Sequence, residues 1–167
     1  DGAVWLVAKR TSPYQLRQFW MQVTDIDIER MLPQFSLRPM EEIASILNEQ
    51  RLSPEKRVAQ RTLANEITSM LHGEESANAA EQAADVLFGA NPVFASEATL
   101  NLIAQEVAVT QMGTAVLHDA VGVLVTTGLA SSNSEARRLL QQRSVRANGE
   151  QLDEHAKLDK VALLHGR

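Results

Sequence analysis

The sequence predicts a mainly α fold, in which a helical domain is followed by a small α+β module. Hydrophobic residues make up 44% of the 167 residues and aromatic residues only 4%, so the core must be built from aliphatic side chains. Apolar residues recur at three- and four-residue steps through residues 12–109, which is the helical period. Near Asn148-Gly149 the pattern changes to that of a two-residue β-hairpin.

The first two helices are marked by their caps. Ser12-Pro13 combines a hydroxyl cap with a proline at the first helical position, and Gln15 could reach back to the amide of the cap, so a helix is predicted to about Val23. Thr24 can cap the next helix, which is predicted to end near Pro33. Acidic residues near its start suit the helix dipole.

The rest of the helical domain has four further predicted helices. Residues 38–50 form the third, and Ser53-Pro54 is predicted to open a long fourth helix that ends at Gly73. Residues 74–88 and 96–109 complete the domain.

The second part begins after a predicted linker at residues 110–114. Residues 115–127 are predicted to form a short helix, and Ser132 to Glu135 is a capping box that starts another. The hairpin at Asn148-Gly149 follows, and a later strand is predicted at Val161 to Leu164.

Charge and composition limit the kinds of partner that this protein can have. The net charge is −5, residues 1–112 carry 9 basic against 15 acidic residues, and residues 113–167 carry 7 against 6. This balance argues against broad, non-specific attraction to nucleic acid. The absence of cysteine excludes disulfides, and no signal peptide or membrane-length apolar run is visible, so we expect a soluble cytoplasmic protein without a membrane partner.

The sequence offers little for catalysis. The four histidines are scattered without metal-ligand spacing, and neither a phosphate-binding glycine loop nor a nucleophile elbow is present. Neighbouring carboxylates fall in the first turns of predicted helices, where acidic residues are usual. We therefore predict no catalytic residue and no metal site.

An arginine cluster is the strongest candidate for binding. Arg137, Arg138, Arg143 and Arg146 lie on the capped helix and the strand after it, where their guanidinium groups could span successive phosphates of folded RNA. The alternative is that these arginines only solvate one face of the protein.

Four strings, considered together, resemble the C-terminal half of bacterial-type tyrosyl-tRNA synthetases. In chain order they are WLVAKRTSPYQLRQFW at residues 5–20, SPEKRVAQRTLANEIT at 53–68, LHGEE at 71–75 and GLASSNSEARRLLQQRSVRANGE at 128–150. The resemblance covers nearly the whole chain.

The resemblance implies a domain organisation. Residues 1–11 would be the exit from the catalytic domain's ATP-holding loop, residues 12–110 a helical anticodon-binding domain, and residues 111–167 an S4-like RNA-binding module that lacks its last strand. The parent protein would attach tyrosine to its tRNA through tyrosyl-adenylate, using ATP bound in a catalytic domain that this fragment lacks. The fragment itself would have no cofactor.

The resemblance also implies partners. The fragment would bind tyrosine-specific tRNA. The parent is expected to be a homodimer through its catalytic domain, and the fragment a monomer.

Residue roles follow from matching motifs. The resemblance places Ser132 and Arg137 at RNA-facing positions and matches the Asn148-Gly149 turn to the family's Val-Asn-Gly turn. Arg143 stands where the family often has glycine, and Asn133 where it often has lysine, so the basic strip is expected to shift toward Arg138, Arg143 and Arg146.

Two carboxylates of the helical domain are candidates for anticodon contacts. Asp25 and Asp27 could accept hydrogen bonds from a guanine edge. The alternative is that they only complement the dipole of their helix.

Two other functions stay open at this point. One is an S4-type RNA-binding module fused to a helical interaction domain in a protein that is not a synthetase. The other is a helical scaffold without an RNA ligand.

Overall fold

The computed structural model describes residues 4–113, 119–156, 158 and 163–166. Its elements are α1 (Pro13–Met21), α2 (Asp25–Phe35), α3 (Met40–Leu52), η1 (Pro54–Lys56), α4 (Val58–His72), α5 (Glu74–Leu87), η2 (Pro92–Phe94), α6 (Glu97–Glu106), α7 (Ala120–Thr126), α8 (Asn133–Gln141), β1 (Arg146–Ala147), β2 (Glu150–Gln151) and η5 (Leu164–Gly166). The predicted mainly α class is confirmed.

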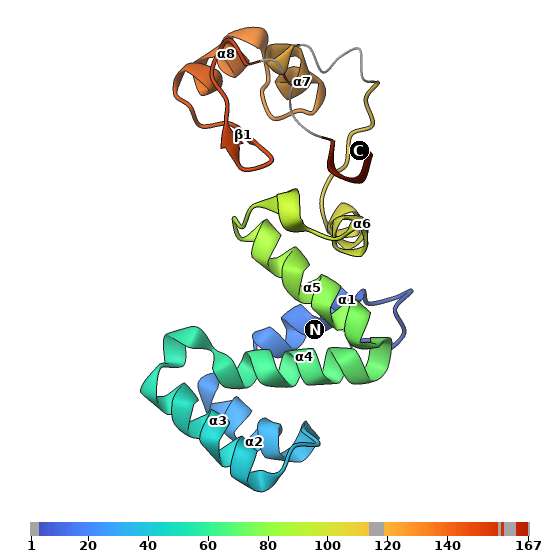
Figure 1. The fold of residues 1–167 in the computed structure, drawn as a ribbon, viewed down its shortest axis with the longest axis vertical. Coiled ribbons are helices and arrows are strands. Elements are labelled where there is room, and N and C mark those ends of the chain that lie inside the picture. Colours follow the sequence, from blue (N-terminus) through green and yellow to red (C-terminus); the bar gives the residue numbers. More distant parts are fainter. Residues whose placement is uncertain (1–3, 114–118, 157, 159–162, 167) are drawn as a thin grey trace.

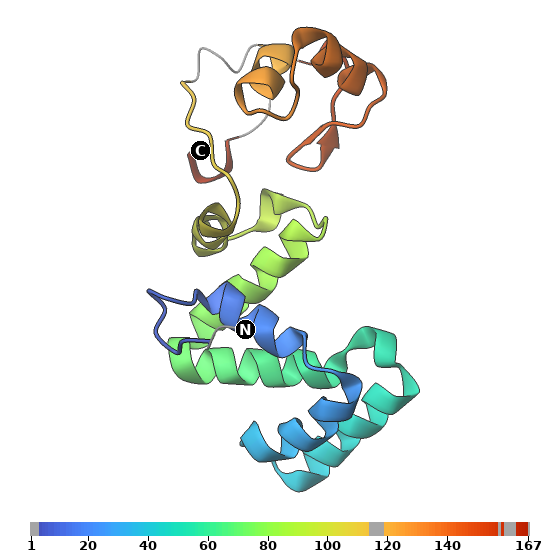
Figure 2. The ribbon, with the colours of Figure 1, turned by 180° about the vertical axis from the view of Figure 1, so that it is seen from behind.

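The helices are arranged along one long axis (Figure 1). Helices α2 and α3 lie at one end, α1, α4 and α5 in the middle, and α7, α8 and the hairpin at the opposite end, with α6 between the middle and that end. Figure 2 shows the same order from behind. None of the helices in the described part of the chain is long and apolar enough to span a bilayer.

Three clusters of buried aliphatic residues hold these helices together. The first joins α2, α3 and α4 through residues such as Ile28, Ile43 and Leu63. The second joins α5 to α6 through small alanines and Leu102. The third joins α7, α8 and the hairpin, with Leu140 at its centre. The sparse aromatic content explains this construction, because close helix packing here uses alanine and leucine.

The predicted N-terminal caps of α1 and α2 are confirmed. Ser12 Oγ accepts a hydrogen bond from the amide of Gln15 at 3.1 Å, and Thr24 Oγ1 accepts one from Asp27 at 3.1 Å. The prediction that the Gln15 side chain reaches back to the cap is wrong. The side chain donates to Glu106 at 3.0 Å instead, because α6 brings that carboxylate alongside the start of α1.

The predicted long fourth helix is interrupted at its start. Ser53-Pro54 opens only the single turn η1, and Arg57 then adopts a left-handed conformation with φ 52°, so α4 begins at Val58. The Arg57 guanidinium donates to the carbonyl of Met21, the last residue of α1, and to that of Val23 just after it. This tertiary contact explains the break, which the local sequence does not mark.

The second part departs from the prediction at two places. Helix α7 begins at Ala120, where the side chain of Asp119 caps Val121, and residues 115–118 of the predicted helix lie outside the described residues. The strand predicted at Val161 to Leu164 is wrong where it can be judged, because Leu164 begins η5. The described strands pair only two residues each, so they offer a third strand little edge to join.

Candidate nucleic-acid interface

Helix α8 carries the first part of the candidate interface. Ser132 Oγ accepts a hydrogen bond from the amide of Glu135 at 3.2 Å, as the capping box predicts. The Glu135 carboxylate reaches back to Ser131 rather than to Ser132, accepting from its amide at 2.9 Å and from its hydroxyl. These hydrogen bonds lower the pKa of Glu135. Ser132 therefore fixes the helix start, and its hydroxyl is already engaged.

The two arginines of α8 face away from the core. Ala136 and Leu140 are buried, whereas Arg137 and Arg138 are exposed. The helical period predicts the solvent side for Arg138 and the border of the apolar face for Arg137. Arg138 lies 3.7 Å from the Glu135 carboxylate, in an ion pair whose arginine side chain is 65% exposed. Such an exposed pair is screened by solvent and weak, so it leaves Arg138 available to a stronger anion.

Arg143 ends α8 in a conformation that normally favours glycine. Its φ is 53°, its amide donates to the carbonyl of Leu140, and the amide of Ser144 donates to that of Leu139. This is the Schellman arrangement, in which the left-handed residue is usually glycine. The geometry gives a backbone reason for the glycine that the resemblance leads one to expect here.

The hairpin carries the fourth arginine. Asn148 and Gly149 have φ values of 50° and 82°, which confirms the predicted two-residue turn. Arg146 pairs with Gln151 across the ladder and is exposed, while Val145 and Ala147 on either side pack against the core of this part. Asn148 is half-buried at the turn.

The arginines are mostly free of acidic partners. Among the described residues, Arg137, Arg143 and Arg146 form no ion pair. A groove of about 250 Å³ beside Arg143 is lined by Asp153 and Glu154, so negative charge borders the cluster on that side. The structure thus presents four exposed arginines on consecutive elements with an acidic margin next to one of them.

The two candidate aspartates of α2 have structural partners. Asp25 Oδ1 accepts hydrogen bonds from Gln60 at 2.7 Å and from Gln50 at 3.0 Å. Asp27 accepts from the Thr24 hydroxyl at 2.8 Å and pairs with Arg30 at 3.0 Å. The Thr24 hydroxyl and Arg30 both lower the pKa of Asp27.

The two glutamines are residues that our sequence reasoning missed. Gln50 and Gln60 are buried in helices α3 and α4, and both orient Asp25. A polar residue on the otherwise apolar face of a predicted helix is the sequence signal that could have identified them. Within the described ranges, no group of three or more histidine, aspartate or glutamate side chains is placed to hold a metal ion.

The fold and the arginine cluster describe a helical protein with a capped-helix and hairpin unit suited to binding a polyanion. The family model for class I tRNA synthetases (W and Y) matches residues 1–89, and the chain belongs to this family. The alternative of a protein outside the synthetases is therefore not favoured.

The particular relatives are tyrosine–tRNA ligases. The chain is 38% identical over 174 residues to the one from Neisseria meningitidis, covering 99% of this chain and 39% of that protein. It is 39% identical over 172 residues to the one from Kineococcus radiotolerans, covering 100% of this chain and 40% of that protein. The chain thus spans about two fifths of the length of these relatives.

A solved structure agrees with the sequence relatives. A C-terminally truncated mitochondrial tyrosyl-tRNA synthetase from Aspergillus nidulans superposes with a TM-score of 0.50 at 38% identity. The superposition covers 52% of this chain and 25% of that protein. Sequence and fold therefore point to the same family.

Proposed function

We propose that this chain is the tRNA-binding part of a tyrosine–tRNA ligase. Residues 12–110 form its anticodon-binding domain and residues 111–167 its S4-like module. The parent protein couples tyrosine to ATP as tyrosyl-adenylate in a separate catalytic domain and transfers the tyrosyl group to tRNA. The parent is a cytoplasmic homodimer through that domain, and this part alone is a monomer without a cofactor.

The exposed arginines are the observation that carries this proposal. Arg137, Arg143 and Arg146 are exposed without ion pairs among the described residues, and Arg138 has only a weak one. Unneutralised guanidinium groups on neighbouring elements favour phosphate, which they can bind bidentately. Because their backbones are fixed by the α8 end and the hairpin, the cluster suits the shape of a folded RNA more than a flexible chain.

Asn148 and Ser132 fix the backbone that carries the four arginines. Asn148 occupies the first position of the tight turn, where asparagine tolerates positive φ, and Ser132 caps α8. We assign both residues to the shape of the RNA-facing surface. Asp25 and Asp27 remain candidates for anticodon bases, because Asp25 is exposed and its Oδ2 atom accepts no hydrogen bond within the described part of the chain.

The test is a filter-binding titration of the chain against tyrosine-specific tRNA at several salt concentrations. Arg146→Gln and Arg137→Gln should each weaken binding and reduce the slope of log K against log salt by about one, since each removes a phosphate contact. Arg51→Gln is a matched control, because that exposed arginine already pairs with Glu29 at 2.8 Å. Equal salt slopes in all three variants would refute the assignment.

A second measurement separates binding from chemistry. In the full-length protein, Arg137→Glu should lower the rate of tRNA charging while leaving tyrosyl-adenylate formation unchanged. If tRNA charging and tyrosyl-adenylate formation fell equally, Arg137 would contribute to the stability of the full-length protein and not to tRNA binding.

A further inference from the structure

A groove of about 310 Å³ lies between the end of α5 and the short helix η2. Phe94 forms one side of it, and three small or aliphatic residues form its apolar remainder. Three polar side chains, Gln82, Asp85 and Asn91, complete the lining. The groove therefore combines an aromatic ring with hydrogen-bonding groups, which is the composition of a site for a flat polar ligand.

The Phe94 ring is held out into solvent by a rigid turn. Its side chain is 87% exposed. Asn91 Oδ1 accepts a hydrogen bond from the amide of Val93 at 3.0 Å, and the Ala95 amide donates to Pro92 at 2.9 Å. Since Ala95 is buried, the turn is anchored at its far end. An exposed ring on a fixed backbone loses little entropy when another ring stacks on it.

The polar groups of the groove still have hydrogen-bonding capacity. Gln82 Oε1 accepts from the Thr99 hydroxyl at 2.9 Å, which orients its amide nitrogen away from that contact. Asn91 uses its oxygen in the turn, so its nitrogen is the remaining donor. The Asp85 carboxylate forms no hydrogen bond or ion pair within the described ranges, although it lies in the field of Arg17. The groove thus offers two amide donors and one carboxylate acceptor.

The groove adjoins the hairpin that carries Arg146. A Cβ atom added to Gly149 would come within 2.8 Å of the Asn91 side chain, so the hairpin turn lies against the loop that forms the groove. An RNA backbone bound by Arg146 of the hairpin would therefore pass close to Phe94. This continuity selects RNA among the ligands with flat polar rings.

We propose that the groove binds an unpaired guanine of the RNA, stacked on Phe94; this inference rests on the proposed tRNA-binding function. Guanine presents two adjacent donors, N1–H and the N2 amine, to the Asp85 carboxylate. Its acceptors O6 and N7 suit the amide donors of Gln82 and Asn91. Adenine, cytosine and uracil each lack a pair of adjacent donors, so the carboxylate discriminates against them.

The direct test uses nucleotides and does not require tRNA. Saturation-transfer NMR on the 167-residue chain should show a stronger signal for GMP than for AMP, CMP or UMP. Phe94→Ala should abolish the GMP signal and Phe94→Tyr should retain it. Phe88→Ala is the matched control, because Phe88 is 82% exposed but does not line the groove. Asp85→Asn should remove the preference for GMP.

Equal signals for the four nucleotides, or a GMP signal that survives Phe94→Ala, would overturn the proposal. Because Phe94 is exposed, the variant is expected to keep the wild-type circular dichroism and melting temperature. A change of oligomeric state in Phe94→Ala without any nucleotide effect would show that the groove docks protein instead, and would also overturn it.

Binding of whole tRNA then separates this proposal from the proposed function. Phe94→Ala should weaken tRNA binding by about tenfold, as the loss of one stacked base does, with an unchanged salt slope because no phosphate contact is removed. If wild type binds GMP but no tRNA, the proposed function fails and with it the RNA ligand, and the groove stands only as a guanine-binding site. If wild type binds tRNA and Phe94→Ala binds it equally well, the guanine site fails and the proposed function stands.

Discussion

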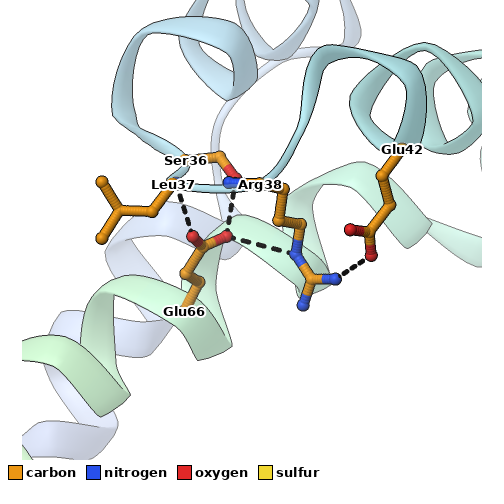
Figure 3. Close-up of polar contacts among 5 residues, drawn as sticks. All are labelled: Ser36, Leu37, Arg38, Glu42 and Glu66. Carbon is orange, nitrogen blue, oxygen red and sulfur yellow. Dashed lines mark hydrogen bonds and ion pairs between the residues drawn. The ribbon is translucent and has the colours of Figure 1, made fainter.

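Glu66 of α4 accepts a hydrogen bond from the backbone amide of Leu37 at 2.7 Å (Figure 3). Its second oxygen accepts from the Ser36 hydroxyl at 2.7 Å and lies 3.3 Å from Nε of Arg38. One carboxylate therefore holds the whole loop between α2 and α3. Apolar burial does not hold this loop, because the Leu37 side chain is 80% exposed.

Glu66→Gln should destabilise the chain by about 1–2 kcal/mol, because one acceptor becomes a donor and the charge opposite Arg38 is lost. The measurement is urea unfolding followed by circular dichroism. Glu42→Gln is the control, since Glu42 forms an exposed ion pair with the same Arg38 and should cost about 0–1 kcal/mol. Similar losses in both variants would show that the loop does not depend on Glu66.

Arg143→Gly should raise stability and weaken RNA binding together. A non-glycine residue in the left-handed region costs about 1–2 kcal/mol, and glycine relieves this cost while removing a guanidinium group. Arg143→Ala is the comparison, because it loses the charge but keeps the Cβ atom and the strain. Differential scanning calorimetry and tRNA binding check the two effects. A glycine variant no more stable than the alanine variant would contradict the strain argument.

Arg17→Met should destabilise the chain by about 2–3 kcal/mol. The Arg17 side chain is 4% exposed and contacts Glu81 and Asn65, so its removal leaves a carboxylate with less compensation. Burial lowers the pKa of Arg17, which means that the charged form already bears a desolvation cost. Arg17→Met combined with Glu81→Gln should therefore lose less than the sum of the single variants in chemical unfolding; strict additivity would rule out the coupling.

Glu135 should make the α8 unit sensitive to acid. Hydrogen bonds from Ser131 lower the pKa of Glu135 in the folded state. A depressed carboxylate pKa stabilises the fold fully above the unfolded-state value of about 4.3, and this stabilisation is lost as the pH falls through the lower folded-state value. The protection factors of the α8 backbone amides, measured from pH 6 to pH 3, should fall less steeply in Glu135→Gln than in wild type. Parallel profiles would exclude this carboxylate as the source.

The sequence predicts the helices well where local signals mark their ends. Ser12, Thr24 and Ser132 cap helices as expected, and Gly73 ends α4 with φ 85°. The Asn148-Gly149 turn is also where its local chemistry predicts. These features depend on a few neighbouring residues, so they can be inferred without the fold.

The candidate site is predicted only in part. The exposure of Arg138 follows from helical periodicity, which places Arg137 only at the border of the apolar face, and that of Arg146 follows from strand alternation. The hydrogen bonds from Gln50 and Gln60 to Asp25 could not be predicted from the sequence, because they join three helices. The groove at Phe94 likewise depends on how the α5 end meets η2.

The sequence by itself determined the helical class, the capped starts, the hairpin turn and the family of this chain. Only the tertiary structure decided that Arg57 breaks the fourth helix, that Glu66 anchors a loop 29 residues away, and that Asn91 lies against the Gly149 turn. The division has a physical cause. Caps and turns satisfy backbone groups within a few residues, whereas these contacts exist only after packing has brought distant segments together.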